Sequence, residues 1–266
     1  MRVSLFVTCV VDMFSPDTGT AAVKVLRACG TEVSCPLGQT CCGQPAWNSG
    51  FAHEAAKVAR TSLDALEADG ADAIVVPAGS CATMMRVFWP EMFSVVGDHE
   101  AADRARTLAT RTYEFSEFVE QQRCIGKLPD VLLPTNPSVA YHHSCHMLRE
   151  LDISEPPVNL VDATGCQRVN WEDDTRCCGF GGLFSMKLPE TSVAMADQKL
   201  NSIPEDTDLL VGSDGSCLMH LRARLDHTGR FLPTKHLAEL LADALDTPPP
   251  GVGIPKRADH VPEASS

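Results

Sequence analysis

Short, mostly apolar runs alternate with longer amphipathic segments along the chain. The run Val3–Val7 leads into Cys9, and Asp72–Pro77 is apolar between its terminal residues, so both are expected to be buried strands. Between them, Phe51–Ala68 repeats apolar residues at the spacing of one helical face. Strands that alternate with helices are typical of parallel sheets, so this part of the chain is predicted to be α/β.

The same alternation starts again after Val131–Pro137, a proline-rich segment that we interpret as a linker. The further strands expected from the pattern are Glu32–Pro36, Val139–His142, Arg168–Trp171, Asp208–Val211 and Phe231–Pro233. The further helices expected are Pro16–Ala28, Ala82–Pro90, Glu100–Gln122, Met147–Leu151, Leu183–Asn201, Leu218–Leu225 and His236–Ala244.

This pattern predicts an α/β protein made of two similar parallel-sheet halves. We expect the first half at residues 1–130 and the second at residues 138–246. Residues 247–266 begin with a proline run and continue with polar and charged residues, so we expect a disordered tail there.

The cysteines follow the repeat with a constant offset of 136 residues. This offset relates Cys41-Cys42-Gly43 to Cys177-Cys178-Gly179, Cys9 to Cys145, and Cys81 to Cys217. Eight of the twelve cysteines therefore form two sets of four with identical spacing, which indicates an internal duplication. The single cysteines all follow predicted strands. Because ligands bind beyond the carboxyl ends of parallel strands, each half is expected to bring its four thiols together.

Composition narrows the classes of protein that fit this pattern. Of the 266 residues, 44% are hydrophobic and 21% are charged, as is typical of a soluble globular protein. A net charge of −13, from 22 Lys and Arg against 35 Asp and Glu, argues against a nucleic-acid or anionic-membrane surface. No apolar stretch approaches ~20 residues, so no membrane span is expected. Met1–Val11 lacks the cleavage pattern of a secretion signal.

Twelve cysteines without an export signal indicate a reducing, cytoplasmic location, where cysteine clusters more often hold metals or perform redox chemistry than form disulfides. Thiolates select iron–sulfur clusters, zinc or Cu(I), and a set of four suits a [4Fe–4S] cluster or zinc. Adjacent cysteines have diverging side chains and suit a multi-iron cluster better than one small ion. We expect one centre per half, with zinc as an alternative at one of them. The predicted metal ligands are Cys9, Cys41, Cys42, Cys81, Cys145, Cys177, Cys178 and Cys217.

Gly43 and Gly179, which follow the two cysteine pairs, are predicted to be cofactor-binding residues. Glycine permits a positive φ and lets the backbone approach a cluster closely. A helix is expected soon after each loop, and its N–H groups and positive end would lower the pKa of nearby thiols.

Other cysteines and histidines leave alternatives open. The cysteines outside the repeat are interpreted as structural: Cys29, Cys35, Cys124 and Cys166. Of these, Cys35 and Cys166 are also candidate auxiliary thiols, because they lie near loops. The histidines beside the second set are compatible with zinc binding, a proton relay or ordinary polar loop positions: His142, His143, His146 and His220. The sequence contains no Ser/His/Asp nucleophile signature, phosphate loop or dinucleotide fingerprint.

The duplicated pattern resembles the cysteine-rich CCG domain of iron–sulfur oxidoreductase subunits. These include the cysteine-rich subunit of heterodisulfide reductase, the iron–sulfur subunit of glycolate oxidase and, with the greatest likeness, a component of lactate utilisation systems. The likeness covers roughly residues 2–245 and is carried by Phe6-Val7-Thr8-Cys9, Gln39–Pro45, Asn48-Ser49-Gly50, Pro77–Cys81, Cys177–Gly182 and Phe184–Lys187. It implies a cytoplasmic iron–sulfur electron-transfer component of a multi-protein system that oxidises L-lactate to pyruvate. It also implies that the partners include further iron–sulfur proteins and that this protein does not catalyse the oxidation by itself.

One departure from the wider CCG pattern limits what the resemblance implies. The last cysteine of that pattern belongs to a Cys-x-x-Cys pair, but Ala78 and Asp214 stand where the earlier cysteine is expected. Each half therefore has four thiols, and the cluster type stays open. The alternatives are a thiol–disulfide redox protein that uses the vicinal cysteines and a zinc-stabilised scaffold subunit, with glycolate as an alternative substrate.

Overall fold

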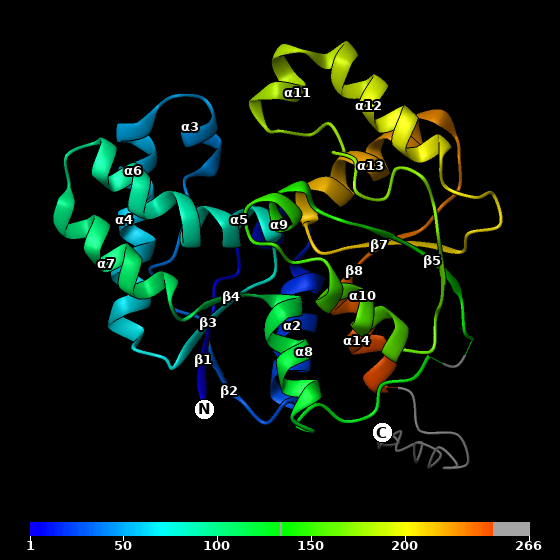
Figure 1. Ribbon diagram of the computed structural model, residues 1–266, viewed down its shortest axis with the longest axis horizontal. Helices are drawn as coiled ribbons and strands as arrows, with labels where there is room; N and C mark the ends of the chain where they lie inside the picture. Colours follow the sequence, from blue (N-terminus) through cyan, green and yellow to red (C-terminus); the bar gives the residue numbers. More distant parts are fainter. Residues whose placement is uncertain (134, 247–266) are drawn as a thin grey trace, which may run out of the picture.

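The computed structural model describes residues 1–133 and 135–246, and it contains two four-stranded parallel sheets (Figure 1). The first sheet has the order β2-β1-β3-β4 and consists of β1 (Arg2–Leu5), β2 (Glu32–Ser34), β3 (Ala73–Val76) and β4 (Thr112–Glu114). The second has the order β6-β5-β7-β8 and consists of β5 (Ser138–His142), β6 (Gln167–Val169), β7 (Leu209–Gly212) and β8 (Thr234–His236). The predicted α/β fold with two similar parallel-sheet halves is confirmed. The predicted tail at 247–266 lies outside the described residues.

Helices connect the strands in both halves. Those of the first half are α1 (Cys9–Phe14), α2 (Pro16–Ala28), α3 (Gln44–Asn48), α4 (Ala52–Asp69), α5 (Gly79–Thr83), the π-helix η1 (Met84–Phe88), α6 (Trp89–Val95), α7 (His99–Ala109) and α8 (Phe115–Cys124). Those of the second half are α9 (Cys145–Arg149), α10 (Glu155–Ala163), α11 (Leu183–Lys187), α12 (Pro189–Asn201), α13 (Gly215–Thr228) and α14 (Leu237–Asp246).

The two sheets have the same register. Val3 lies opposite Ala73 in the first sheet, and Val139 lies opposite Leu209 in the second, so both partners are shifted by 136 residues. The last strands differ by only 122 residues, because α7 of the first half has no counterpart between α13 and β8. The duplication is therefore conserved in the strands and the cysteine loops, and it diverges in the helices that follow β3.

Three of the predicted elements are wrong. Glu100–Gln122 is not one helix, because β4 lies inside it between α7 and α8. This strand has three residues, too few for a periodic pattern to reveal, and it is defined by its pairing with β3. The last strand begins at Thr234, after the predicted Phe231–Pro233, and the predicted helix Leu183–Asn201 is divided at Leu188 into α11 and α12. Proline at the first position of α12 begins the new helix.

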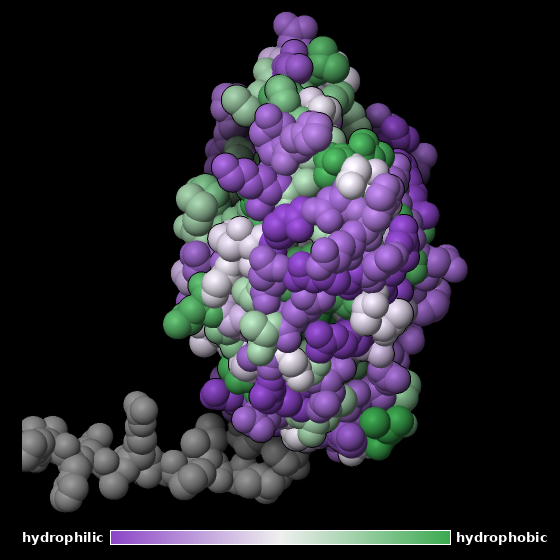
Figure 2. Space-filling view, turned by 90° about the vertical axis from the view of Figure 1, so that its left-hand side faces the viewer, coloured by the Kyte–Doolittle hydropathy of each residue, from purple (hydrophilic) through white to green (hydrophobic). Residues whose placement is uncertain are grey.

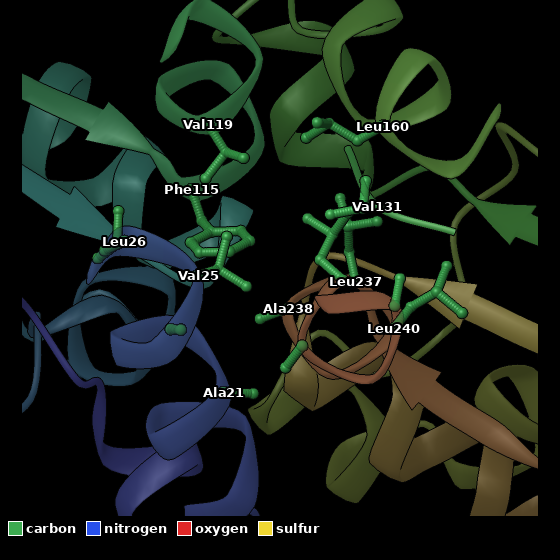
Figure 3. Close-up of a cluster of buried hydrophobic side chains, with 14 of the residues drawn as sticks. Ala21, Val25, Leu26, Phe115, Val119, Val131, Leu160, Leu237, Ala238 and Leu240 are labelled. Carbon is green, nitrogen blue, oxygen red and sulfur yellow. The ribbon is translucent and has the colours of Figure 1, made fainter. Parts of the chain in front are cut away.

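A central layer of four helices fills the space between the two sheets. α2 and α8 from the first half and α10 and α14 from the second contribute to one buried hydrophobic cluster, which also contains strand residues from both sheets. Figure 3 shows this cluster, in which Val25 and Phe115 of the first half lie near Leu237 and Ala238 of the second. The two halves therefore share one core and are not independent globules.

Contacts between the halves come in matched pairs. α2 packs on α14 and α8 packs on α10. Because α2 corresponds to α10 and α8 corresponds to α14, the repeat converts each of these two contacts into the other. The same holds for α5 on α9 and for α1 on α13, which lie at the carboxyl ends of the central strands. Matched contacts of this kind are expected when an approximate two-fold axis relates the two halves. This two-fold relation places the carboxyl ends of both sheets at the centre of the molecule.

The outer faces of the sheets are covered by separate helices. α4, α6 and α7 cover the first sheet, and α12 and α13 cover the second (Figure 1). The face seen in Figure 2, which belongs to the first half, is mostly hydrophilic, and its hydrophobic residues are scattered. Ion pairs such as Arg60–Asp98 and Arg104–Glu67 link α4 to the start and middle of α7. Among the described residues, no helix has the length and apolar character needed to span a membrane.

Candidate metal centre

The four single cysteines of the repeat all lie just beyond the carboxyl ends of central strands. Cys9 begins α1 after β1, and Cys145 begins α9 after β5. Cys81 lies in the first turn of α5 after β3, and Cys217 lies in the first turn of α13 after β7. The vicinal pairs lie in the loops before α3 and α11. The single cysteines therefore all lie at helix N-termini, whose positive end favours a nearby thiolate.

The structure brings the four thiols of the first set together. Cys9 Sγ lies 3.6 Å from Cys41 Sγ, and Cys42 Sγ lies 3.3 Å from Cys81 Sγ. Each vicinal cysteine thus contacts a different strand-end cysteine, as expected from diverging neighbouring side chains. Cys42 and Cys81 are buried, whereas Cys9 and Cys41 are partly exposed.

The second set repeats this arrangement. Cys178 Sγ lies 3.0 Å from Cys217 Sγ, and both residues are buried. Cys145 and Cys177 interact through their thiols and are partly exposed, like their counterparts in the first half. None of the eight thiols forms a disulfide. Each half therefore presents two buried and two partly exposed sulfurs.

Both sets face one cavity between the halves, which the sequence did not predict. All eight cysteines of the repeat line this cavity, whose volume is ≈ 120 Å³. Its remaining walls are mostly small or apolar, and the polar side chains among them include Gln44, His146 and Asp214. The two four-thiol sets are therefore neighbours, and the approximate two-fold relation of the halves explains why they meet.

Gly43 and Gly179 are conformationally required. Their φ angles are +87° and +89°, a region that residues with side chains rarely adopt. A Cβ atom would lie 2.8 Å from Ala55 O at Gly43 and 2.6 Å from Ser192 O at Gly179. Both glycines also donate their N–H to the Sγ two residues earlier, at 3.4 Å. They shape the two cysteine loops, and their predicted contact with a cofactor stays a prediction.

The thiols of each set share negative charge unequally. Hydrogen bonds from Cys42 and, to a smaller extent, from Cys9 lower the pKa of Cys41. Hydrogen bonds from Cys145 and, to a smaller extent, from Cys178 lower the pKa of Cys177. The same contacts raise the pKa values of the donating thiols. Each set therefore favours one thiolate stabilised by protonated neighbours. A bound metal would replace those protons, since metals bind the deprotonated form.

Asp214 joins the two halves. It stands at one of the two positions where the wider CCG pattern has a further cysteine. Its Oδ2 accepts a hydrogen bond of 2.8 Å from Ser80 N, and its Oδ1 accepts one of 3.1 Å from Ser216 N. Gly79 N also donates to Ser213 O at 3.2 Å across the same contact. The carboxylate caps two helix N-termini, α5 and α13, where a thiol would leave these donors unpaired. Ala78, its counterpart, is buried.

The histidines beside the second set have different environments. His142 is fully buried, and burial followed by the charge of Lys199 holds its pKa well below the usual value. His143 packs edge-on against Tyr141, His146 lines the cavity, and His220 Nε2 lies 3.2 Å from Ser192 Oγ. Of these, only His142 joins a compact ligand group in the described part of the chain, with Cys178 and Cys217.

Lys199 was not identified from the sequence. It is fully buried in α12, and its Nζ donates to the backbone oxygens of Asp173, Asp174 and Arg176 in the loop before Cys177. Its counterpart in the repeat is Leu63. Extending the 136-residue comparison beyond the cysteines would have revealed this lysine on an apolar helical face.

The cysteines outside the repeat do not join the eight. Cys29 and Cys166 are buried away from the cavity, in the core shared by the halves. Cys124 is exposed on α8, and Cys35 is exposed beside a second, larger pocket that also touches Cys9 and Cys41. The structure thus separates eight clustered thiols from four scattered ones.

The residues present fit a thiophilic metal centre. The donor set consists of eight soft sulfurs with one imidazole nearby, so hard cations that prefer oxygen ligands are disfavoured. The cysteine-rich cavity is compatible with iron–sulfur clusters or zinc.

Comparison with known proteins supports the same view of the chain. The model of the CCG family, described as a cysteine-rich domain, matches twice, at residues 3–86 and 139–222. "Lactate utilization protein A" of Geobacillus sp. (strain WCH70) is 40% identical over 243 residues, which cover 91% of this chain and 99% of that protein. "Lactate utilization protein A 1" of Bacillus anthracis (strain CDC 684 / NRRL 3495) is 40% identical over 250 residues, which cover 92% and 100%.

A solved structure shares the fold. A hypothetical protein from Helicobacter pylori superimposes with a TM-score of 0.68 at 10% sequence identity, and the match covers 93% of this chain and 49% of that one. At this identity the likeness concerns the fold alone. The two CCG matches fall on the two four-thiol halves, and the curated relatives match over nearly their whole length. This chain belongs to the duplicated CCG cysteine-rich domain family and, within it, to the lactate utilisation protein A family.

Proposed function

We propose that this protein is a cytoplasmic iron–sulfur electron-transfer component of a multi-protein system that oxidises L-lactate to pyruvate. The observation that carries the proposal is that eight thiols from two halves line one cavity. Relatives named for lactate utilisation match over nearly their full length, which supports the physiological role. Iron–sulfur clusters, when bound, supply one-electron transfer.

The residues of the chain would perform three tasks in this role. Cys9, Cys41, Cys42 and Cys81 would hold one centre, and Cys145, Cys177, Cys178 and Cys217 would hold the other. The glycine loops position the vicinal cysteines, and one vicinal and one strand-end cysteine of each set are buried. Because both sets face one cavity, electrons would pass between them over a short path. Removal of hydrogen from lactate falls to a partner component in this proposal.

Metal analysis of anaerobically purified protein tests the proposal. We expect brown protein that contains iron and sulfide. Cys81→Ser should lower the iron content to about half, because one of two sets loses a buried donor. Cys29→Ser is the matched control, since Cys29 is also buried but lies outside both sets, and it should retain the iron. Protein that stays colourless and free of iron after reconstitution would contradict the proposal.

Growth of a deletion strain tests the substrate. A strain that lacks this protein should fail to grow on L-lactate and should keep its growth on glycolate. The wild-type gene should restore growth, and a gene that encodes Cys81→Ser should not. The opposite selectivity would assign the protein to glycolate oxidation.

A thiol–disulfide role is the second candidate function. The 3.0 Å contact between Cys178 Sγ and Cys217 Sγ favours it, because these thiols are close enough to oxidise to a disulfide. The close sulfur contacts join the vicinal pairs to strand-end cysteines, so a disulfide between Cys41 and Cys42 is not the favoured pairing. Retention of redox activity by iron-free protein would support this role.

A further inference from the structure

The two four-thiol sets are not surrounded by the same side chains. Residues 136 positions apart are equivalent in the two sheets, and two buried apolar residues of the first half have polar counterparts in the second. Phe6 corresponds to His142, and Leu63 corresponds to Lys199; all four side chains are fully buried. An imidazole and an ammonium group have thus taken the place of packing groups beside the second set.

Lys199 has a structural explanation. Its Nζ donates to three backbone oxygens of the loop before Cys177, including Asp174 O at 3.1 Å and Arg176 O at 2.7 Å. It also lies 4.6 Å from the centre of the Trp171 ring, where the π-face attracts a cation. These contacts satisfy the ammonium group, and they hold the second cysteine loop against α12.

His142 has no comparable explanation. Its side chain is fully buried at the end of β5, and neither Nδ1 nor Nε2 makes a hydrogen bond of standard geometry. A backbone oxygen near the ring, Asp174 O, already accepts hydrogen bonds from His143 N and Lys199 Nζ. A neutral imidazole carries one donor and one acceptor, so leaving both unpaired in a closed core is unfavourable. Packing alone does not account for the ring, because Phe6 fills the equivalent space without this penalty.

Two thiol sulfurs close to this ring point to the missing partner. A ring nitrogen of His142, Cys178 Sγ and Cys217 Sγ all lie within 4.8 Å of one another. Within residues 1–133 and 135–246, no other three histidine, cysteine or carboxylate groups have ligand atoms this close to one another. The two sulfurs are already assigned to the second centre, so a metal held by them would lie within reach of the imidazole.

We propose that His142 is a ligand of the metal centre in the second half, which is therefore a mixed imidazole–thiolate site, whereas the first centre is held by thiolates alone. This inference rests on the metal-binding function proposed above. Imidazole nitrogen binds both iron and zinc.

Pulsed electron paramagnetic resonance tests the assignment on the full chain. The protein is purified anaerobically with ¹⁵N-labelled histidine and reduced with dithionite; zinc-containing protein is studied after substitution with cobalt(II). We expect the strong hyperfine coupling of a directly bonded histidine nitrogen. His142→Phe, which introduces the residue of the first half, should abolish it and release the metal of one centre. His142→Cys, which supplies another soft ligand, should retain the metal without the coupling.

His143→Phe is the matched control. His143 is the next residue of the chain, but its ring lies 4.9 Å from that of Tyr141, on the opposite face of the strand. This variant should keep both the coupling and the metal. A wild-type protein with metal but only weak nitrogen coupling, or with strong coupling that survives His142→Phe, would overturn the inference and leave the proposed function intact. A wild-type protein that binds no metal would overturn both.

Discussion

Two buried ionisable residues occupy equivalent places as the last residues of the last strands, Glu114 in β4 and His236 in β8. Burial raises the pKa of Glu114 to about 8 and lowers that of His236 to about 4, so both side chains favour their neutral forms. Glu114 Oε2 accepts hydrogen bonds from Ser116 and Glu117, whereas its Oε1 has no partner. The fold thus buries the Glu114 carboxyl and the His236 imidazole in places where a charged side chain is unfavourable.

Glu114 should make the protein less stable as the pH rises through neutrality. The unfolded carboxyl loses its proton near pH 4.5, but the folded one keeps it up to about pH 8. The contribution of this group to stability is therefore complete below pH 4.5 and declines until pH 8. Between pH 6 and 8, the wild type should lose about 2–3 kcal/mol of unfolding free energy relative to Glu114→Gln. Denaturant titrations at several pH values measure this difference.

Glu32→Gln is the control for this prediction, because Glu32 is an exposed carboxylate on the same sheet. Its effect on unfolding free energy should not vary over this pH range. Parallel pH profiles for the wild type and Glu114→Gln would show that Glu114 ionises normally in the folded protein.

At the scale of the structural elements, each cysteine loop depends on a helix of its own half. Gly43 lies against the backbone of α4, and Gly179 lies against the backbone of α12, so the first turn of each helix limits where the loop can run. The vicinal cysteines are thereby held over the carboxyl ends of the central strands. The geometry of each thiol set therefore results from a strand, a loop and a helix packed together.

Gly43→Ala should destabilise the protein by more than the strain of a positive φ alone. That strain amounts to about 1–2 kcal/mol, and the clash of the new Cβ with Ala55 O should add about 1–3 kcal/mol. Gly97→Ala is the matched control, because Gly97 has a φ of +80° but no atom within 4 Å of the added Cβ. Denaturant midpoints measure both effects. Equal losses in the two variants would mean that the loop moves away from α4 freely.

At the scale of the whole molecule, the central helical layer joins the halves into one folding unit. α2, α8, α10 and α14 place residues of both halves in the same buried cluster (Figure 3). The thiol cavity lies at the same junction, with helices of both halves around it. Separation of the halves would therefore expose the core and divide the cavity at the same time.

The two halves should unfold in one cooperative transition. Trp89 reports on the first half and Trp171 on the second, and both are buried. With 5-fluorotryptophan in the metal-free protein, the ¹⁹F signals of these residues should change at the same urea concentration. Trp47→Phe provides the assignment of the third tryptophan signal. Separate midpoints for Trp89 and Trp171 would contradict a shared core.

The sequence by itself determined the α/β class, the duplication and the two repeated sets of four cysteines, because apolar runs, helical spacing and cysteine offsets are local or periodic signals. Tertiary structure decided what depends on contacts between distant segments. It defined β4 by pairing with β3, and it brought both thiol sets to one cavity through contacts between the halves. It also placed His142 beside Cys178 and Cys217. A linear sequence carries no direct record of such proximities, since they arise from packing across the approximate two-fold.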